Sequence, residues 1–149
     1  MTPLRRKLSL AVALLSLAGI VVSSVSLYQH MSSSKTSYCD FGESFNCDIV
    51  NRSTYSTVAG IPVALIGIFG YLTLLTLTTV FRIKPETPAI LFVLSLAGLA
   101  FAIYLTYIEA VVLATWCILC LSSLAVIFTI TVLSSFLMLH TRRGADLTR

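Results

Sequence analysis

Charge is scarce in this sequence: Asp, Glu, Lys and Arg make up only 11% of its 149 residues, whereas soluble domains carry roughly 25%. Four long stretches have no charged residue at all, namely 8–29, 53–81, 87–108 and 110–141. This scarcity excludes an ordinary soluble globular domain. Hydrophobic residues make up 57% of the chain instead.

The uncharged stretches have the length of transmembrane helices. About 20 apolar helical residues cross the ~30 Å hydrocarbon core of a bilayer. We predict four spans, at approximately 8–28, 60–81, 89–110 and 115–139. They leave no room for a separate soluble domain. Residues 1–149 are therefore expected to form one all-α membrane domain, a four-helix bundle with an extracytoplasmic loop between helices 1 and 2.

Most basic residues flank the spans on one side of the membrane. Eight of the ten lie before span 1, between spans 2 and 3, or after span 4: Arg5, Arg6, Lys7, Arg82, Lys84, Arg142, Arg143 and Arg149. By the positive-inside rule these segments are cytoplasmic. We expect a multi-pass protein of the cell inner (cytoplasmic) membrane with both termini in the cytoplasm. The net charge thus encodes topology, and nucleic-acid binding is not expected.

The N-terminus also has features of a cleavable secretory signal, because a basic segment precedes the apolar stretch Leu8–Val22. That stretch continues to about Tyr28, however, which is longer than a typical signal core. Cleavage would also place the C-terminal arginines on the wrong side. A retained first span is favoured.

The four cysteines form two pairs. Cys39 and Cys47 lie in the polar segment 29–59, and Cys117 and Cys120 form a Cys-Ile-Leu-Cys motif at the start of the last span. The predicted topology puts both pairs on the non-cytoplasmic side, where disulfides persist. Two such pairs in a chain with so little other chemistry favour thiol–disulfide exchange.

The Cys-x-x-Cys spacing suits redox chemistry, because residues three apart share a helix face. The N-terminus of a helix also lowers the pKa of a thiol. We expect Thr115 to cap this helix and Trp116 to lie at the membrane interface. A structural role for Cys39 and Cys47 is the alternative, but closing so short a loop stabilises a fold by only about 2.6 kcal/mol.

A zinc site is the other alternative for these cysteines, and it lacks ligands. Zinc takes four Cys, His or carboxylate ligands, and the only histidines are His30 and His140, on opposite sides of the predicted membrane. We therefore expect no metal, and interpret His30 as a solvated residue at the interface. Glu109, near the outer end of span 3, is likewise interpreted as an interfacial side chain that snorkels toward water.

Taken together, several motifs resemble the vitamin K epoxide reductase family in its prokaryotic branch. The matching residues are Cys39, Cys47, Ser53, Gly60-Ile-Pro62, Gly67, Gly70 and Trp116-Cys-Ile-Leu-Cys120. Their order and placement cover residues 8–139. DsbB-like quinone reductases also have four helices and two cysteine pairs, but in them the Cys-x-x-Cys pair comes first.

This resemblance implies a bundle that encloses a quinone beside Cys117 and Cys120. Cys39 and Cys47 would be a shuttle pair that takes two electrons from a thioredoxin-like or DsbA-like oxidoreductase. A shuttle thiol would reduce the Cys117–Cys120 disulfide through Cys117, Cys120 would act on the quinone, and Ser53 would donate a hydrogen bond near a quinone oxygen. Which of the two shuttle cysteines meets the partner stays open.

Two departures refine these expectations. Family members that handle vitamin K in animals carry a tyrosine where this chain has Leu124. A ubiquinone or menaquinone type of acceptor is therefore expected, rather than epoxide reduction. Many prokaryotic members have a fused thioredoxin-like domain, whereas this sequence stops at Arg149, so we expect a separate partner protein. The rival hypothesis is a non-catalytic four-span scaffold or transporter braced by disulfides.

Overall fold

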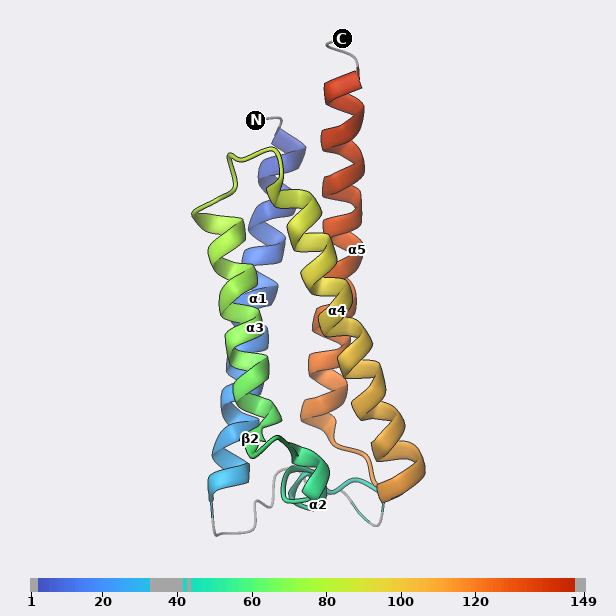
Figure 1. The fold of residues 1–149 in the computed structure, drawn as a ribbon. Helices are drawn as coiled ribbons and strands as arrows, with labels where there is room; N and C mark the ends of the chain where they lie inside the picture. The colour runs from blue at the N-terminus through green and yellow to red at the C-terminus, as the bar shows by residue number, and fades with distance from the viewer. Residues whose placement is uncertain (1–2, 33–41, 43, 147–149) are drawn as a thin grey trace.

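The computed structural model describes residues 3–32, 42 and 44–146, with side chains up to Arg142. Its elements are α1 (Pro3–Met31), the short α2 (Cys47–Asn51), the 3₁₀ turn η2 (Thr54–Ser56), strands β1 (Thr57–Val58) and β2 (Ile61–Pro62), α3 (Val63–Thr79), α4 (Thr87–Tyr107), the π-helical η3 (Ile108–Leu113) and α5 (Ile118–Asp146). The four long helices pack together, which confirms the predicted all-α bundle (Figure 1).

Three helices in the described part of the chain are long and apolar enough to cross a membrane, namely Pro3–Met31, Thr87–Leu113 and Ile118–Arg142. The fourth, α3, has 17 residues, at the lower limit for a transmembrane helix. It is shorter than the predicted span 60–81 because the chain pairs Thr57 with Pro62 in a small antiparallel hairpin before the helix begins.

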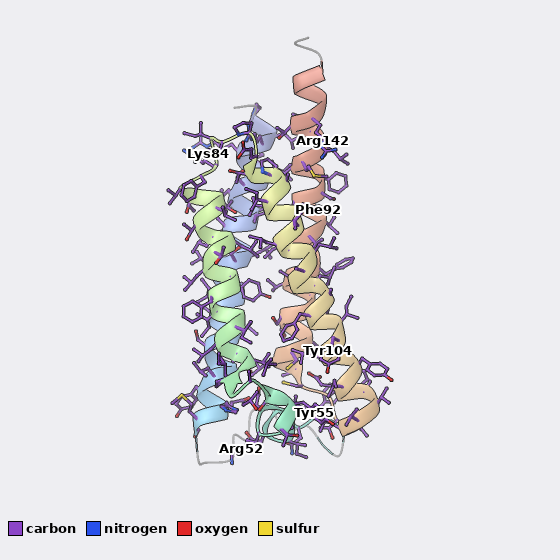
Figure 2. All side chains as sticks on the ribbon, viewed as in Figure 1. Arg52, Tyr55, Lys84, Phe92, Tyr104 and Arg142 are labelled. Carbon is purple, nitrogen blue, oxygen red and sulfur yellow. The ribbon has the colours of Figure 1, made fainter. Side chains whose placement is uncertain are left out.

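The bundle has two different ends. The start of α1, the turn between α3 and α4, and the end of α5 lie together at one end, whereas α2 and β2 lie at the other (Figure 1). Lys84 and Arg142 are at the first end, and Arg52 and Tyr55 are at the second (Figure 2). An even number of spans places the basic segments together in this way.

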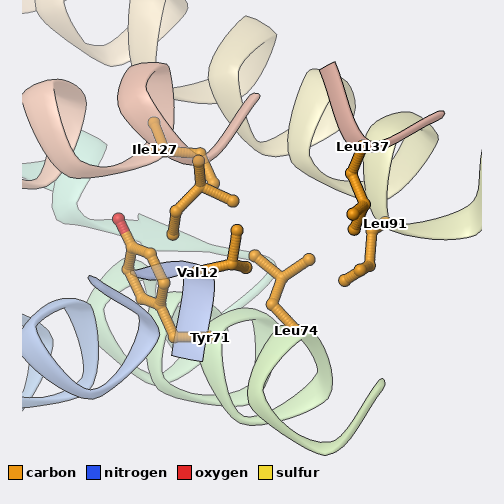
Figure 3. Close-up of a cluster of buried hydrophobic side chains, with 7 residues drawn as sticks. Val12, Tyr71, Leu74, Leu91, Ile127 and Leu137 are labelled. Atoms are coloured by element: carbon orange, nitrogen blue, oxygen red, sulfur yellow. The ribbon is translucent and has the colours of Figure 1, made fainter. Parts of the chain in front are cut away.

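Helix α1 contacts both α3 and α5, and α4 packs mainly on α5. Their shared core consists of Val12, Tyr71, Leu74, Leu91, Ile127, Ile130 and Leu137 (Figure 3). Two glycines permit the close approach of α1 and α3. A Cβ on Gly19 would lie 2.5 Å from the Tyr71 ring, and one on Gly67 would lie 2.8 Å from Ser23 Oγ. A Cβ on Gly70 would meet nothing within 4 Å, so Gly70 has no such packing role.

Candidate functional site

The loop cysteine Cys47 begins α2 and is buried, with 1% of its surface exposed. Asn46 caps this short helix, because its side-chain oxygen accepts a hydrogen bond from the Ile49 N–H at 3.2 Å. Cys47 is disulfide-bonded, whereas Cys117 and Cys120 are free thiols. Cys39, the other predicted shuttle cysteine, lies outside the described residues.

A backbone bridge joins the two cysteine-bearing segments. The Asn46 N–H donates to the Trp116 carbonyl at 3.1 Å, and the Trp116 N–H donates to the Ser44 carbonyl at 2.9 Å. These hydrogen bonds pair Phe45 with Trp116. Cys47 directly follows Asn46, and Cys117 directly follows Trp116. Both sulfur-bearing residues are then buried in one cluster with Val50. Cysteines 70 positions apart in the sequence are thus held side by side.

Cys117 lies at the N-terminus of α5, as predicted. Its carbonyl accepts the hydrogen bond from the Leu121 N–H at 3.0 Å, so the thiol sits at the positive end of the helix. A hydrogen bond from the Cys120 thiol lowers the pKa of Cys117, and the backbone N–H groups of Cys120 and Leu119 add to this. Burial and the Glu109 charge oppose the shift without reversing it.

The segment before α5 differs from the prediction. Span 4 was expected to begin at 115, but the helix begins at Ile118. Thr115 does not cap it, because its hydroxyl donates to the Leu113 carbonyl at 3.1 Å. The chain leaves η3 through Ala114, whose φ of 48° is in the left-handed region. Trp116 then pairs with Phe45 in the bridge to the loop before α2.

Glu109 corrects the sequence interpretation most clearly. Instead of snorkelling, it is buried with 2% of its surface exposed. Its Oε2 accepts a hydrogen bond from the Cys117 N–H at 3.1 Å, and its carboxyl group also interacts with the Cys120 thiol. The π-helical turn η3 that carries Glu109 changes the helical register at this point. A regular helix pattern gave no signal for this inward orientation.

A polar network that the sequence did not reveal surrounds Asn51. The Asn51 amide donates to Gln29 Oε1 at 2.9 Å, and its Oδ1 accepts from the Ser26 hydroxyl at 2.7 Å. His30 is half-buried, with Nδ1 against the Asn51 carbonyl and 3.3 Å from Ser56 Oγ. The interpretation of His30 as a solvated residue was therefore wrong. The sequence signal for this network is that Ser26, Gln29 and His30 lie within a five-residue stretch of α1.

A cavity of about 420 Å³ lies beside these groups, between α1, α3, α4 and α5. Its walls are largely apolar, and its polar lining includes His30, Asn51, Ser53, Glu109 and Cys120. Ser53 donates its hydroxyl hydrogen to the Val50 carbonyl at 2.8 Å. An apolar cavity of this size with a few polar groups at one end is typical of a site for a small organic ligand.

The donor set does not resemble a metal centre. Within residues 3–32, 42 and 44–146, no group of three or more His, Cys, Asp or Glu side chains is placed to hold a metal ion.

The cavity between the helices suits a flat quinone ring, because its apolar walls suit the ring and its polar end suits the carbonyl oxygens. The Cys120 thiol is at that end.

Comparison with models of known protein families identifies a match over most of the chain. The model described as "Vitamin K epoxide reductase family" matches residues 10–135, which is most of the chain. A search of curated proteins finds no matching sequence.

Proposed function

Because the chain belongs to the vitamin K epoxide reductase family, whose members are quinone-dependent thiol–disulfide oxidoreductases, we propose that it is a membrane thiol oxidase for a thioredoxin-like partner. It is a multi-pass membrane enzyme. In this proposal the partner forms disulfides in other proteins and is reoxidised here. The electrons leave to a membrane quinone of the ubiquinone or menaquinone type.

One observation carries the proposal: the bridge between Phe45 and Trp116 brings Cys47 beside Cys117. Exchange requires a thiolate to reach a disulfide sulfur through a mixed disulfide. A rigid staple in the loop would have no reason to be buried against a second cysteine pair. The placement of Cys120 on the cavity wall supplies the other end of the path.

The proposed electron path has two exchange steps. The partner's dithiol reduces the Cys39–Cys47 disulfide, so one disulfide forms in the partner and two thiols form in the loop. A loop thiolate then attacks Cys117 of the oxidised Cys117–Cys120 pair, and the S–S bond between them breaks. The second loop thiol displaces Cys117 from the mixed disulfide, which restores the loop disulfide and leaves Cys117 and Cys120 reduced.

The quinone, when bound, supplies the acceptor for the two electrons and two protons of this reduced pair. The chain provides the surroundings for that transfer. The apolar walls exclude water, and Ser53 places its hydroxyl oxygen at the polar end of the cavity. Cys120 presents its thiol there, while Cys117 remains behind it at the loop. Each pair thus faces its own reaction partner.

The topology supports an extracytoplasmic reaction. The basic residues at the end marked by Lys84 and Arg142 face the cytoplasm in our proposal (Figure 2). Helix α2, which begins at Cys47, lies at the opposite end (Figure 1). A single-cysteine label at Ile83 or Tyr55, both exposed, tests this orientation with a membrane-impermeant reagent. The impermeant reagent, added from outside, should label a cysteine at position 55 but not one at position 83. Labelling at position 83 alone would show that the orientation is the reverse of the proposed one.

Reconstitution tests the function. The protein is placed in lipid nanodiscs with a thioredoxin-like dithiol protein and, in turn, ubiquinone or menaquinone. Disulfide formation in the partner should consume quinone in equal amounts. The rival scaffold or transporter predicts no quinone-dependent oxidation with any acceptor. If, in addition, the four cysteines keep the same pairing under all conditions, their disulfides are structural.

A further inference from the structure

The Glu109 carboxyl group contacts both cysteines of the thiol pair and lines the cavity. Oε2 accepts the Cys117 N–H at 3.1 Å, and the same carboxyl interacts with Cys120. Glu109 also lines the cavity wall. It is therefore the described side chain that joins the backbone of Cys117, the thiol of Cys120 and the cavity.

A purely structural role accounts for only one of the two oxygens of the Glu109 carboxyl group. Oε2 satisfies a backbone N–H, but Oε1 is buried with no hydrogen-bond partner among the described residues. Burying a carboxyl oxygen without a partner is unfavourable, and an amide would serve the Cys117 N–H equally well. An acid with a free oxygen beside a thiol is equipped to accept and release a proton.

We propose that Glu109 is the proton carrier of the Cys117–Cys120 pair: it accepts the Cys120 proton as that thiol reacts and releases it at the polar end of the cavity. This inference rests on the proposed function for its final acceptor. It assigns a role that the cysteines themselves do not fill, because a thiol that forms a disulfide has to lose its hydrogen.

The balance of the reaction requires such a group. When Cys117 and Cys120 form a disulfide, two S–H bonds break, one S–S bond forms, and two electrons and two protons leave. A quinone in the cavity takes up both electrons and both protons and leaves as the quinol. Glu109 ends each turnover in the protonation state in which it began, since it passes on every proton that it receives from Cys120.

Other titratable groups at the cavity are occupied elsewhere. The Tyr71 hydroxyl is hydrogen-bonded to Ser123 at 2.9 Å, and His30 is held by the Asn51 carbonyl and Ser56. Tyr55 is exposed at the end of the bundle. Only Glu109, among the described cavity residues, has a recorded interaction with either active-site cysteine through an ionisable oxygen.

Glu109→Gln and Glu109→Asp test the proposal, with Glu86→Gln as the matched control. The amide keeps an acceptor for the Cys117 N–H but cannot carry a proton, whereas aspartate keeps the acid on a shorter side chain. Glu86 is exposed at the start of α4, far from the cysteines. All variants are compared with the full-length wild type in lipid nanodiscs.

The first readout needs no quinone. Infrared difference spectra are recorded between the disulfide and dithiol states of the protein, which is reduced with dithiothreitol. A carboxyl signal should change in wild type and in Glu86→Gln, and that signal should be absent in Glu109→Gln. A wild-type spectrum without any carboxyl change overturns the proposal, whatever the protein does with quinones.

The second readout is single-turnover oxidation of the reduced pair by a soluble quinone. Loss of a general acid–base group slows such a step by about 10²- to 10⁴-fold, so Glu109→Gln should fall in that range and Glu109→Asp should recover part of the rate. Reduction of the Cys117–Cys120 disulfide by dithiothreitol serves as the fold control. Unchanged quinone oxidation in Glu109→Gln contradicts the proposal.

These readouts separate the two hypotheses. If wild type exchanges thiols but oxidises no quinone, the proposed function fails, while the infrared signal still shows whether the Glu109 carboxyl group responds to oxidation of the thiol pair. If Glu109→Gln does not fold, Glu109→Asp decides. The carboxyl signal of Glu109→Asp should shift. Relative to wild type, its oxidation by quinone should slow more than its reduction by dithiothreitol. Equal slowing of the two steps overturns the role.

Discussion

The side-chain amide of Asn51 lies 4.0 Å from the Cys117 sulfur. Its other hydrogen bonds, to Gln29 and Ser26 of α1, fix the amide in this position. An N–H donor beside a sulfur stabilises the thiolate over the thiol. Asn51 therefore connects the loop helix α2 to the reactivity of the cysteine that the loop disulfide has to reach.

We predict that Asn51→Leu slows thiol exchange at Cys117. The substitution keeps a side chain of similar size but removes the donor, so the pKa of Cys117 should rise. A rise of one unit reduces the thiolate at neutral pH by about tenfold. The rate of alkylation of Cys117 in a Cys120→Ser background measures this. An Asn51→Leu curve that overlies the parent curve would exclude a role for the amide.

The pH dependence of Cys117 is a second prediction. Its pKa is lowered chiefly by a hydrogen bond from the Cys120 thiol. The Cys117 thiolate therefore forms at a lower pH than the thiolate of an ordinary cysteine, whose pKa is about 8.5. Alkylation should rise as pH passes this lowered pKa and level off above it. In Cys120→Ala the donor is lost and the midpoint should move to higher pH. A midpoint that stays in place in Cys120→Ala contradicts the assigned cause.

Helix packing gives a prediction about stability. Alanine at Gly19 places a Cβ 2.5 Å from the Tyr71 ring, which is itself buried and bonded to Ser123. Overpacking of this kind destabilises a fold by about 1–3 kcal/mol. The melting temperature in detergent should fall for Gly19→Ala and stay near wild type for Gly70→Ala, where a Cβ meets nothing within 4 Å. Equal melting temperatures would show that α1 and α3 separate easily.

Ser53 provides a prediction about the quinone. Its oxygen lines the cavity while its hydrogen is donated to the Val50 carbonyl, so a bound carbonyl has to compete for that hydrogen. We expect Ser53→Ala to lower kcat/KM for quinone by roughly tenfold, the loss of one modest hydrogen bond. Exchange with a dithiol should be unaffected. The exposed Thr54→Ala is the control, and a matching loss in that variant would assign the effect to the loop as a whole.

The sequence predicts the architecture well because membrane helices are defined by composition. Long uncharged stretches and flanking basic residues were enough to give the bundle and the shared end of its basic segments. The boundaries were less accurate where backbone pairing decides them. Thr57–Pro62 form a hairpin, and Trp116 pairs with Phe45 in a bridge, so α3 and α5 begin later than hydropathy predicts.

The candidate site was predicted in part. The motifs predict Cys47, Cys117, Cys120 and Ser53 as site residues, but no motif predicts Glu109 or Asn51. The predicted Cys39 lies outside the described residues. Glu109 is predicted to be interfacial because it precedes the short turn expected at 111–114, whereas a π-helical turn carries the carboxyl group inward. No pattern in the sequence singles out Asn51. Both depend on contacts between distant segments, which residue patterns along one chain do not encode.

Trapping of the mixed disulfide tests the central claim most directly. Cys120→Ala is combined in turn with Cys39→Ala or Cys47→Ala, so that neither Cys120 nor a second loop thiol can resolve a disulfide between Cys117 and the remaining loop cysteine. After limited oxidation, peptide mass spectrometry should identify Cys117 linked to Cys39 or Cys47, and quinone-dependent oxidation of the partner should be lost. A protein in which Cys117 never joins either loop cysteine, or in which Cys120→Ala still passes electrons to quinone, would contradict the relay.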